Sequence, residues 1–245
     1  MNDIAPIEIC SVVHLVRPAR REVADIEGLA RGIAEVEPAS LFYHVVQPPL
    51  RAPASTDLPP DDFSAWVGGV LQDRETAERL SLAAQRAGAG PESLRTALLQ
   101  ALENRRPTHR APEGGEFSFL AADTVVVPIA DAFDADVAMV ALAHADASAW
   151  FYHLVEQPWF SGGGVPLSTA LRATGAARLA ERLELMSRSG FPLEKLRRDT
   201  IRMYRRLRLG SRVAAAAATS ELERTEEARD AAARLARRLV RGGKA

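Results

Sequence analysis

The sequence has almost no cysteine and no long apolar run. Cys10 is the only cysteine among 245 residues, so no disulfide bond can form within the chain. No run approaches the ~20 apolar residues that a membrane-spanning helix requires. The opening MNDIAPIEIC lacks the basic segment and apolar core of a signal peptide. We therefore expect a cytoplasmic protein without a membrane partner, and the abundance of alanine and arginine suggests a bacterial source.

Neither sign of charge is in excess, and common catalytic motifs are missing. Lys and Arg number 31 against 32 Asp and Glu, which leaves no overall positive field to attract nucleic acid. The chain has no His-Glu-x-x-His, no Cys-x-x-Cys pair and no Gly-x-Ser-x-Gly. The glycine-rich SGGGVP at 161–166 lacks the Gly-Lys-Ser/Thr of a phosphate-binding loop and is typical of a turn. We expect no metal, no cofactor and no nucleic-acid partner.

The chain does contain an internal repetition. IEICSVVHLVRP from residue 7 aligns with FSFLAADTVVVP from residue 117, and DIEGLARGIAEVEPASLFYH at 25–44 aligns with DADVAMVALAHADASAWFYH at 134–153. A third match joins AERLSLAAQRAGAGPESLR to AERLELMSRSGFPLEKLR. The matches occur in the same order in both halves, and small changes of offset are what loop insertions and deletions produce. The pattern predicts a tandem duplication.

Each half is expected to open with a strand and continue as helices. The opening segments are rich in β-branched and aromatic residues, and the segment after the first one has apolar residues at helical spacing, Ile26, Leu29, Ile33 and Val36. The predicted fold class is α+β and predominantly α-helical, with two tandem pseudo-symmetric repeats, each opening with a β-strand, and a C-terminal helix. The predicted boundaries are a first repeat at 1–106, a linker at 107–115, a diverged second repeat at 116–210 and a charged helical tail at 211–245.

Two local patterns predict helix starts. SLFYHVV begins with Ser40, a favourable N-cap residue, and ends at proline. PDDFSAWVGGVL at 60–71 indicates a helix that Asp61 or Asp62 caps, with Phe63 and Trp66 packed on the helix that carries Tyr43. The second half has GGGVPLSTALRATG instead, without the acidic pair and the tryptophan.

The repeated Tyr-His step admits two interpretations. In the first, the aromatic residues belong to the core and the Tyr-His pairs form hydrogen bonds within the core or between the halves. In the second, a pseudo-twofold axis brings the two histidines toward one ligand site, where a histidine could act as a general base or, with a carboxylate, bind a metal. The candidate ligand-binding residues are Tyr43, His44, Asp62, Tyr152, His153 and Glu156.

Charge is segregated near the end of the chain. RRDTIRMYRRLRLGSR at 197–212 is basic, and the following SELERTEEARDAAARLARRLVR has its acids first and its arginines last, an order that complements the helix dipole. The arginines either form a solvated face or bind a phosphate or an acidic partner. The tail is either a solvated helix or a helix that docks on a partner protein or on a second copy. The candidate partner-binding residues are Arg197, Arg198, Arg202, Arg205 and Arg206.

The first half resembles an uncharacterised archaeal and bacterial domain family of unknown function. The resemblance rests on a Leu-x-x-Gly-Ile helix at 29–33, the Ser-aromatic-Tyr-His step at 40–44 and the acidic-Phe-x-x-Trp step at 61–66, and it covers about residues 7–105. The second half is similar only through 148–153. Val-Val-Gln-Pro-Pro stands here where the family has further histidines after the Tyr-His step. The family has no established activity, so the resemblance implies a module rather than a function.

Two functions from different classes follow. The first is a non-catalytic binding or adaptor protein built from two fused modules, which docks on a protein partner or self-associates through its C-terminal helix. The second is an enzyme or small-ligand sensor with a Tyr/His site between the repeats. The absence of a complete catalytic constellation favours the first. Burial of both histidines against apolar neighbours, with no cavity beside them, would argue against the second.

Overall fold

The computed structural model describes residues 6–48, 61–86, 90–103, 110–162, 164–187 and 193–209. The chain divides into two compact units, residues 1–197 and 198–245. The first unit contains the whole predicted first repeat and most of the predicted second repeat. The predicted tail at 211–245 lies outside the described residues.

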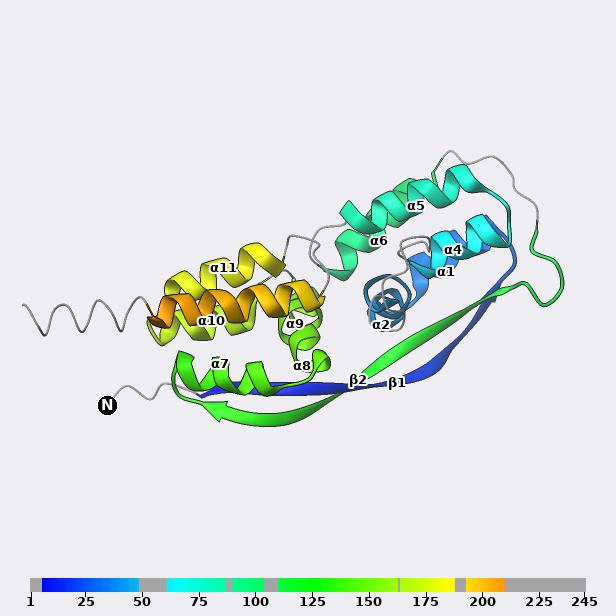
Figure 1. Cartoon of the computed structure of the whole chain (residues 1–245). Coiled ribbons are helices and arrows are strands. Elements are labelled where there is room, and N and C mark those ends of the chain that lie inside the picture. Colours follow the sequence, from blue (N-terminus) through cyan, green and yellow to red (C-terminus); the bar gives the residue numbers. More distant parts are fainter. Residues whose placement is uncertain are drawn as a thin grey trace, which may run out of the picture. The chain divides into compact units, whose positions relative to one another are not determined.

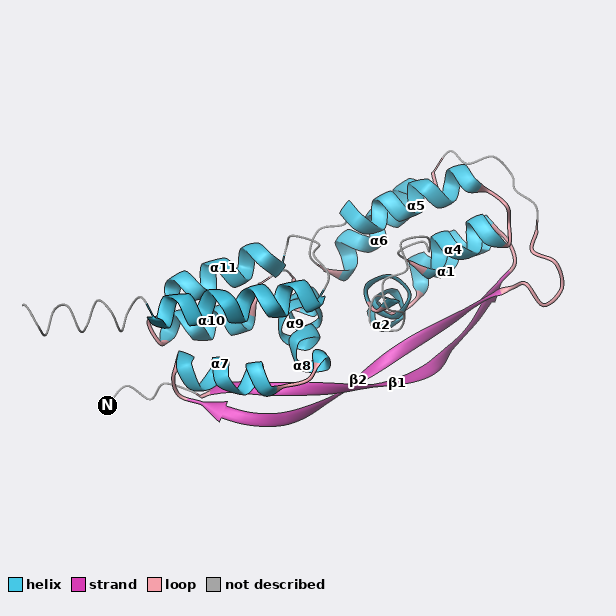
Figure 2. Ribbon diagram, viewed as in Figure 1, coloured by secondary structure: helices cyan, strands magenta, loops and turns pink. Residues whose placement is uncertain are grey.

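Two long strands form an antiparallel ribbon (Figures 1 and 2). The strands are β1, Ile7–Val23, and β2, Phe117–Ala132, and they pair along most of their lengths. The prediction that each half opens with a strand is therefore confirmed. The pairing joins the two halves, because Ile7 at the start of β1 lies opposite Ala132 at the end of β2, and Val23 lies opposite Phe117.

Helices lie along one side of this ribbon (Figure 1). The first half supplies α1 (Ile26–Glu35), α2 (Pro38–Leu41), η1 (Phe42–Val46), α4 (Asp62–Gly69), α5 (Arg74–Arg86) and α6 (Pro91–Ala101). The second half supplies α7 (Ala135–His144), α8 (Ala147–Phe151), η2 (Tyr152–Glu156), α9 (Gln157–Phe160), α10 (Pro166–Ala173) and α11 (Ala177–Ser187). A further helical run covers 193–209. The fold is α+β and mostly helical, as predicted. Within the described residues no helix is long and apolar enough to cross a membrane.

Aspartate side chains start five of the helices. Each accepts a hydrogen bond from the backbone N–H three residues further on, which satisfies one of the otherwise unpaired amides of a first helical turn. They are Asp25, Asp61, Asp73, Asp134 and Asp146. The predicted cap at Asp61 is thus confirmed. The predicted cap at Ser40 is wrong, because the helix begins earlier, at Pro38, and Ser40 lies inside it.

The repeated Tyr-His steps occupy π-helical turns. Phe42–Val46 forms η1 and Tyr152–Glu156 forms η2, each directly after a short α-helix. Wider turns of this kind are rare and often occur at functional sites. The change of pitch rotates the histidines relative to the preceding helix, so ordinary helical periodicity could not predict their directions.

The core contains the predicted apolar stripe of α1 and joins the two halves. The four stripe residues are all buried, namely Ile26, Leu29, Ile33 and Val36. Phe42 is fully buried and its ring lies 5.9 Å from that of Phe151 and 5.4 Å from that of Trp159, both from the second half. Aromatic contacts at these distances add to the free energy of burial.

Gly32 allows α1 to approach β2 closely. A β-carbon at this position would lie 2.5 Å from two ring atoms of Phe119, whose side chain is buried. We expect Gly32→Ala to reduce the free energy of unfolding by about 1–3 kcal/mol, because the core must shift to admit the methyl group. Gly69→Ala is the matched control, since nothing lies within 4 Å of its added β-carbon. Chemical denaturation of both variants tests this; equal stability of both would contradict the close contact.

Candidate functional site

His44 forms hydrogen bonds with both ring nitrogens. Its Nε2 accepts a bond of 2.9 Å from the backbone N–H of Leu120 in β2. Its Nδ1 lies 2.8 Å from a carboxylate oxygen of Asp62 at the start of α4. Since Nε2 accepts, the ring proton resides on Nδ1 and is donated to Asp62. Two of the candidate ligand-binding residues, His44 and Asp62, are therefore in contact, and the other ring nitrogen of His44 is bonded to the backbone of the second half.

His153 makes the corresponding contact at the other end of the ribbon. Its Nε2 accepts a bond of 3.0 Å from the backbone N–H of Cys10 in β1. Burial lowers the pKa of His153 to about 4, so the ring is neutral at pH 7. The neighbouring Gln157 side chain acts in the opposite direction, toward a higher pKa of His153. The side-chain oxygen of Gln157 and Nδ1 of His153 do not form a hydrogen bond of standard geometry.

Both histidines accept amides from irregular points of the ribbon. Cys10 lies opposite Pro128, and Leu120 lies opposite Pro18. Proline has no N–H and cannot complete a regular pair of ladder bonds, and the register shifts beside both pairs. Because unpaired buried amides are costly, each histidine stabilises a point where the ladder is interrupted. The Nε2 lone pairs are thereby occupied in hydrogen bonds to backbone amides.

The structure does not bring the two histidines together. His44 contacts the β2 residue opposite Pro18, whereas His153 contacts Cys10, eight residues away along β1. At ~3.3 Å per strand residue the two contacts are about 26 Å apart. The expectation of one shared site for His44 and His153 is therefore wrong. The reason is the antiparallel pairing of β1 with β2, which places the starts of the two strands at opposite ends of the ribbon. Each histidine contacts a residue near the start of the other half's strand.

The remaining candidates, Tyr43, Tyr152 and Glu156, do not lie together in one site. Tyr43 is buried with its ring against His44, and Tyr152, which is only partly buried, has its ring against His153, in both cases edge to face. Glu156 contacts neither candidate histidine. Its buried carboxylate contacts His14 at 2.8 Å and accepts a hydrogen bond from the Thr124 hydroxyl.

His14 and Thr124 were missed from the sequence. They lie opposite each other near the middle of the ribbon. The alignment of the two halves also places His14 over Thr124. If the halves are copies related by a twofold axis, two residues that both align and pair must lie near that axis. This signal could have identified them once the strand pairing was known.

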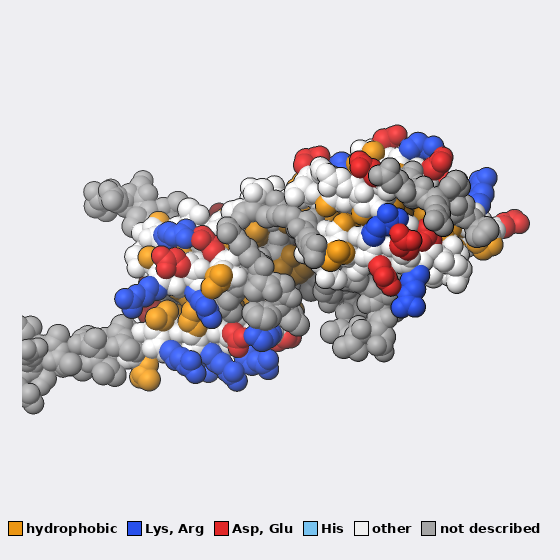
Figure 3. Space-filling view, turned by 90° about the horizontal axis from the view of Figure 1, so that it is seen from above, with side chains coloured by type: hydrophobic (Ala, Val, Ile, Leu, Met, Phe, Trp, Pro, Cys, Tyr) orange, Lys and Arg blue, Asp and Glu red, His pale blue; other side chains and the backbone are white. Residues whose placement is uncertain are grey.

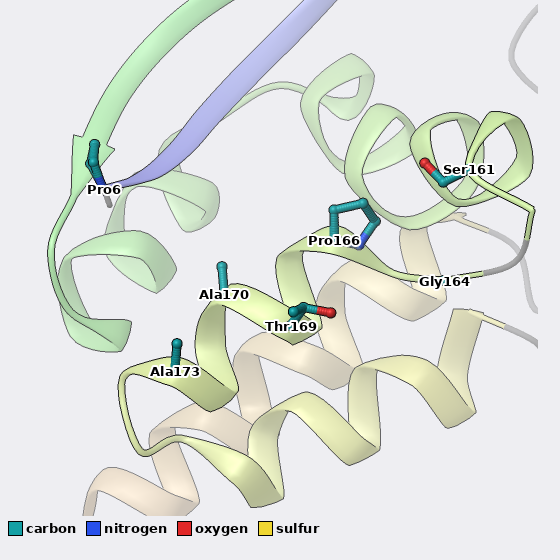
Figure 4. A pocket seen from close by; sticks show the side chains of 7 residues that line it. All are labelled: Pro6, Ser161, Gly164, Pro166, Thr169, Ala170 and Ala173. Carbon is teal, nitrogen blue, oxygen red and sulfur yellow. The ribbon is translucent and has the colours of Figure 1, made fainter. Parts of the chain in front are cut away.

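A shallow pocket lies between the start of β1 and α10 (Figure 4). Its volume is about 580 Å³ and it is lined by Pro6, Ser161, Gly164, Pro166, Thr169, Ala170 and Ala173. Two hydroxyl groups are the only polar side chains in this set, and none of the lining residues is an acid or a base. In the described part of the chain, no three His, Cys, Asp or Glu residues are grouped to hold a metal.

The candidate arginines lie on the helical run at 193–209. Four of them, Arg198, Arg202, Arg205 and Arg206, are exposed, and Arg197 forms an ion pair with Glu194. Figure 3 shows a row of Lys and Arg side chains on one face of the molecule, whereas acidic and basic side chains are interspersed elsewhere on that face.

An exposed apolar surface lies on the ribbon itself. Val13 lies directly opposite Val125, and Leu15 and Val127 are two residues further along their strands, so all four share one face. Their exposed fractions are 54%, 45%, 56% and 43%. His14, between Val13 and Leu15, points to the helix-covered side, where it contacts Glu156. We call Val13, Leu15, Val125 and Val127 the ribbon strip.

Comparisons with known proteins identify a family and a solved structure with a similar fold. A family model described as "Family of unknown function (DUF5752)" matches residues 5–205, which confirms the resemblance to an uncharacterised family and extends it over both halves. The solved structure of OrfY from Thermoproteus tenax is similar, with 23% identity and a TM-score of 0.68 over 84% of this chain and 98% of OrfY. At this identity the similarity shows the fold alone. No curated protein matches the chain.

Proposed function

The chain belongs to a family of unknown function, DUF5752, and we propose that it is a non-catalytic binding or adaptor protein made of two fused repeats. The ribbon strip is the observation that carries this proposal. The largest exposed apolar patch of a monomeric protein typically covers about 300–600 Å² and is often its functional surface.

Reciprocal hydrogen bonds between the halves support the proposal that the halves are two repeats. His44 of the first half accepts the amide of Leu120, and His153 of the second half accepts that of Cys10. In the alignment of the halves His44 corresponds to His153, and Cys10 corresponds to Leu120. An exchange of equivalent bonds is what two copies related by a pseudo-twofold axis would make. The Tyr-His steps then serve the architecture that joins the copies.

The chemistry of the described residues supports a non-catalytic role. Both repeated histidines are buried and bind backbone amides, and the Glu156 carboxylate is occupied by His14 and Thr124. Cys10 is buried, and burial raises the pKa of its thiol, which disfavours the reactive thiolate. The pocket beside α10 offers hydroxyl groups but no acid or base.

The tail at 211–245 is proposed as a second contact with a protein partner or another copy. It lies outside the described residues, and the proposal rests on its sequence alone. Its acids lie between Glu221 and Asp230, an arginine cluster follows at 234–241, and the basic run at 197–212 comes before both. We also propose that the protein acts without nucleic acid, because its charges nearly cancel.

Site-specific photo-crosslinking in the native cell tests the proposed function. A photoreactive amino acid at Leu15 should give discrete protein crosslinks, because the ribbon strip is expected to contact a protein. Leu185 on α11 is the matched control, since it is a leucine that is 60% exposed, against 56% for Leu15. A third label at Leu235 examines the tail. Crosslinks no more frequent at Leu15 than at Leu185, together with none at Leu235, would refute a binding role.

A further inference from the structure

We propose that the ribbon strip is the contact surface for a second copy of this chain, so that two ribbons pack face to face in a homodimer. The inference rests on the proposed binding function and names its partner. In the described part of the chain β1 and β2 form a two-stranded sheet, with helices along one side (Figure 1). Two-stranded sheets gain stability when an apolar face is covered, and sheets that pack face to face lie about 10 Å apart.

The exposed apolar area of the ribbon strip is close to the apolar area that a small standard dimer interface buries. From their exposed fractions, the ribbon strip and neighbouring Ile129 present on the order of 400 Å² of apolar surface. A standard interface buries about 800 Å² per partner, of which about 56–65% is apolar. At the lower end of the standard range, about 600 Å² per partner, the apolar share is about 340–390 Å², which the strip and Ile129 supply. Val16 and Val126 are also exposed but alternate toward the other side of the ribbon.

The charges beside the strip favour a second copy over a charged partner. Arg17 forms a hydrogen-bonded ion pair of 2.7 Å with Asp123 across the strands, and a second ion pair of 2.6 Å with Glu37. The Arg17 cation is paired with both carboxylates within one subunit, which leaves one net negative charge at the edge of the strip and no unpaired cation among these three side chains. The centre of the face is apolar. Such a surface is complementary to itself, as an isologous twofold interface requires.

Sedimentation equilibrium of the full chain tests the proposal. The wild type should sediment as a dimer, at about twice the 26.5 kDa of one chain, with dissociation on dilution. Leu15→Glu places a charge in the proposed interface and should raise the dissociation constant at least ~100-fold, because the carboxylate would lose its water. Leu185→Glu should leave the constant unchanged. Circular dichroism and thermal melting confirm folding, and Val13→Lys provides a second variant of the same face.

The outcomes separate this inference from the proposed function. A wild-type chain that stays monomeric at ~100 μM, or a dimer that neither Leu15→Glu nor Val13→Lys weakens, would overturn the dimer through this face. A monomer whose Leu15 label crosslinks to a different protein would overturn the second copy but leave the binding function intact. A monomer whose label crosslinks to its own residues 210–245 would assign the strip to the tail. Crosslinks between position 15 and another copy's β1 or β2 would support the dimer.

Discussion

Replacing Trp66 with alanine is expected to lower the free energy of unfolding by about 3–5 kcal/mol, the usual cost of truncating a buried large aromatic residue. Trp66 is only 7% exposed, and its ring lies 5.6 Å from that of Phe117 at the start of β2. Its indole N–H also donates a hydrogen bond of 2.8 Å to the backbone carbonyl of Gly115. The residue thereby attaches α4, from the first half, to the segment that leads into the second half's strand.

Trp66→Phe separates the two contributions of this residue. Phenylalanine retains most of the apolar contact with Phe117 but leaves the Gly115 carbonyl without its donor, so we expect a loss of about 1–2 kcal/mol. Chemical denaturation measures both variants. A melting temperature of Trp66→Ala equal to that of the wild type would contradict the packing. Equal losses in both variants would assign the effect to the hydrogen bond alone.

The helix at Trp66 shows what the sequence could predict. The acidic-Phe-x-x-Trp step predicted a capped helix, and Asp61 does cap α4 with a bond to the Ser64 amide. A cap and a helical stripe depend on residues a few positions apart, so their pattern is visible locally. Phe63 contacts His44 as part of the predicted packing, with ring centres 5.3 Å apart. The Trp66 ring also packs on Phe117, a contact between the halves that local spacing could not reveal.

The candidate site shows what the sequence could not predict. Both strands were predicted, but a strand's composition does not identify its partner, and here β1 pairs with β2 more than 90 residues away. That pairing decides where the histidines point, because His44 and His153 each reach an amide of the opposite strand. The repeated Tyr-His motif suggested convergence on one site. The antiparallel ribbon instead places residues that align between the halves, such as Cys10 and Leu120, toward opposite ends, and residues near its middle, such as His14 and Thr124, lie opposite each other.

The stability of the fold is expected to fall by about 3 kcal/mol between pH 6.5 and pH 4 because of His153. Burial lowers the pKa of His153 from 6.5 to about 4 in the folded chain. Between these values the unfolded chain binds a proton that the folded chain does not, so acid favours unfolding. Each pKa unit corresponds to 1.36 kcal/mol. The contribution of the neutral ring is fully present above pH 6.5 and is lost as the pH falls toward 4.

His153→Gln should remove this part of the pH dependence. Glutamine offers an oxygen that can accept the Cys10 amide, but it does not titrate, so the variant should lose less stability than the wild type between pH 6.5 and 4. His144→Gln is the control, since His144 is exposed at the end of α7 and forms no such buried contact. Asp61 opposes the trend, because burial raises its pKa and the folded chain then takes up a proton more readily as the pH falls. Urea denaturation across this pH range measures all three chains. An unchanged acid slope in His153→Gln would show that His153 does not hold the Cys10 amide as a neutral ring.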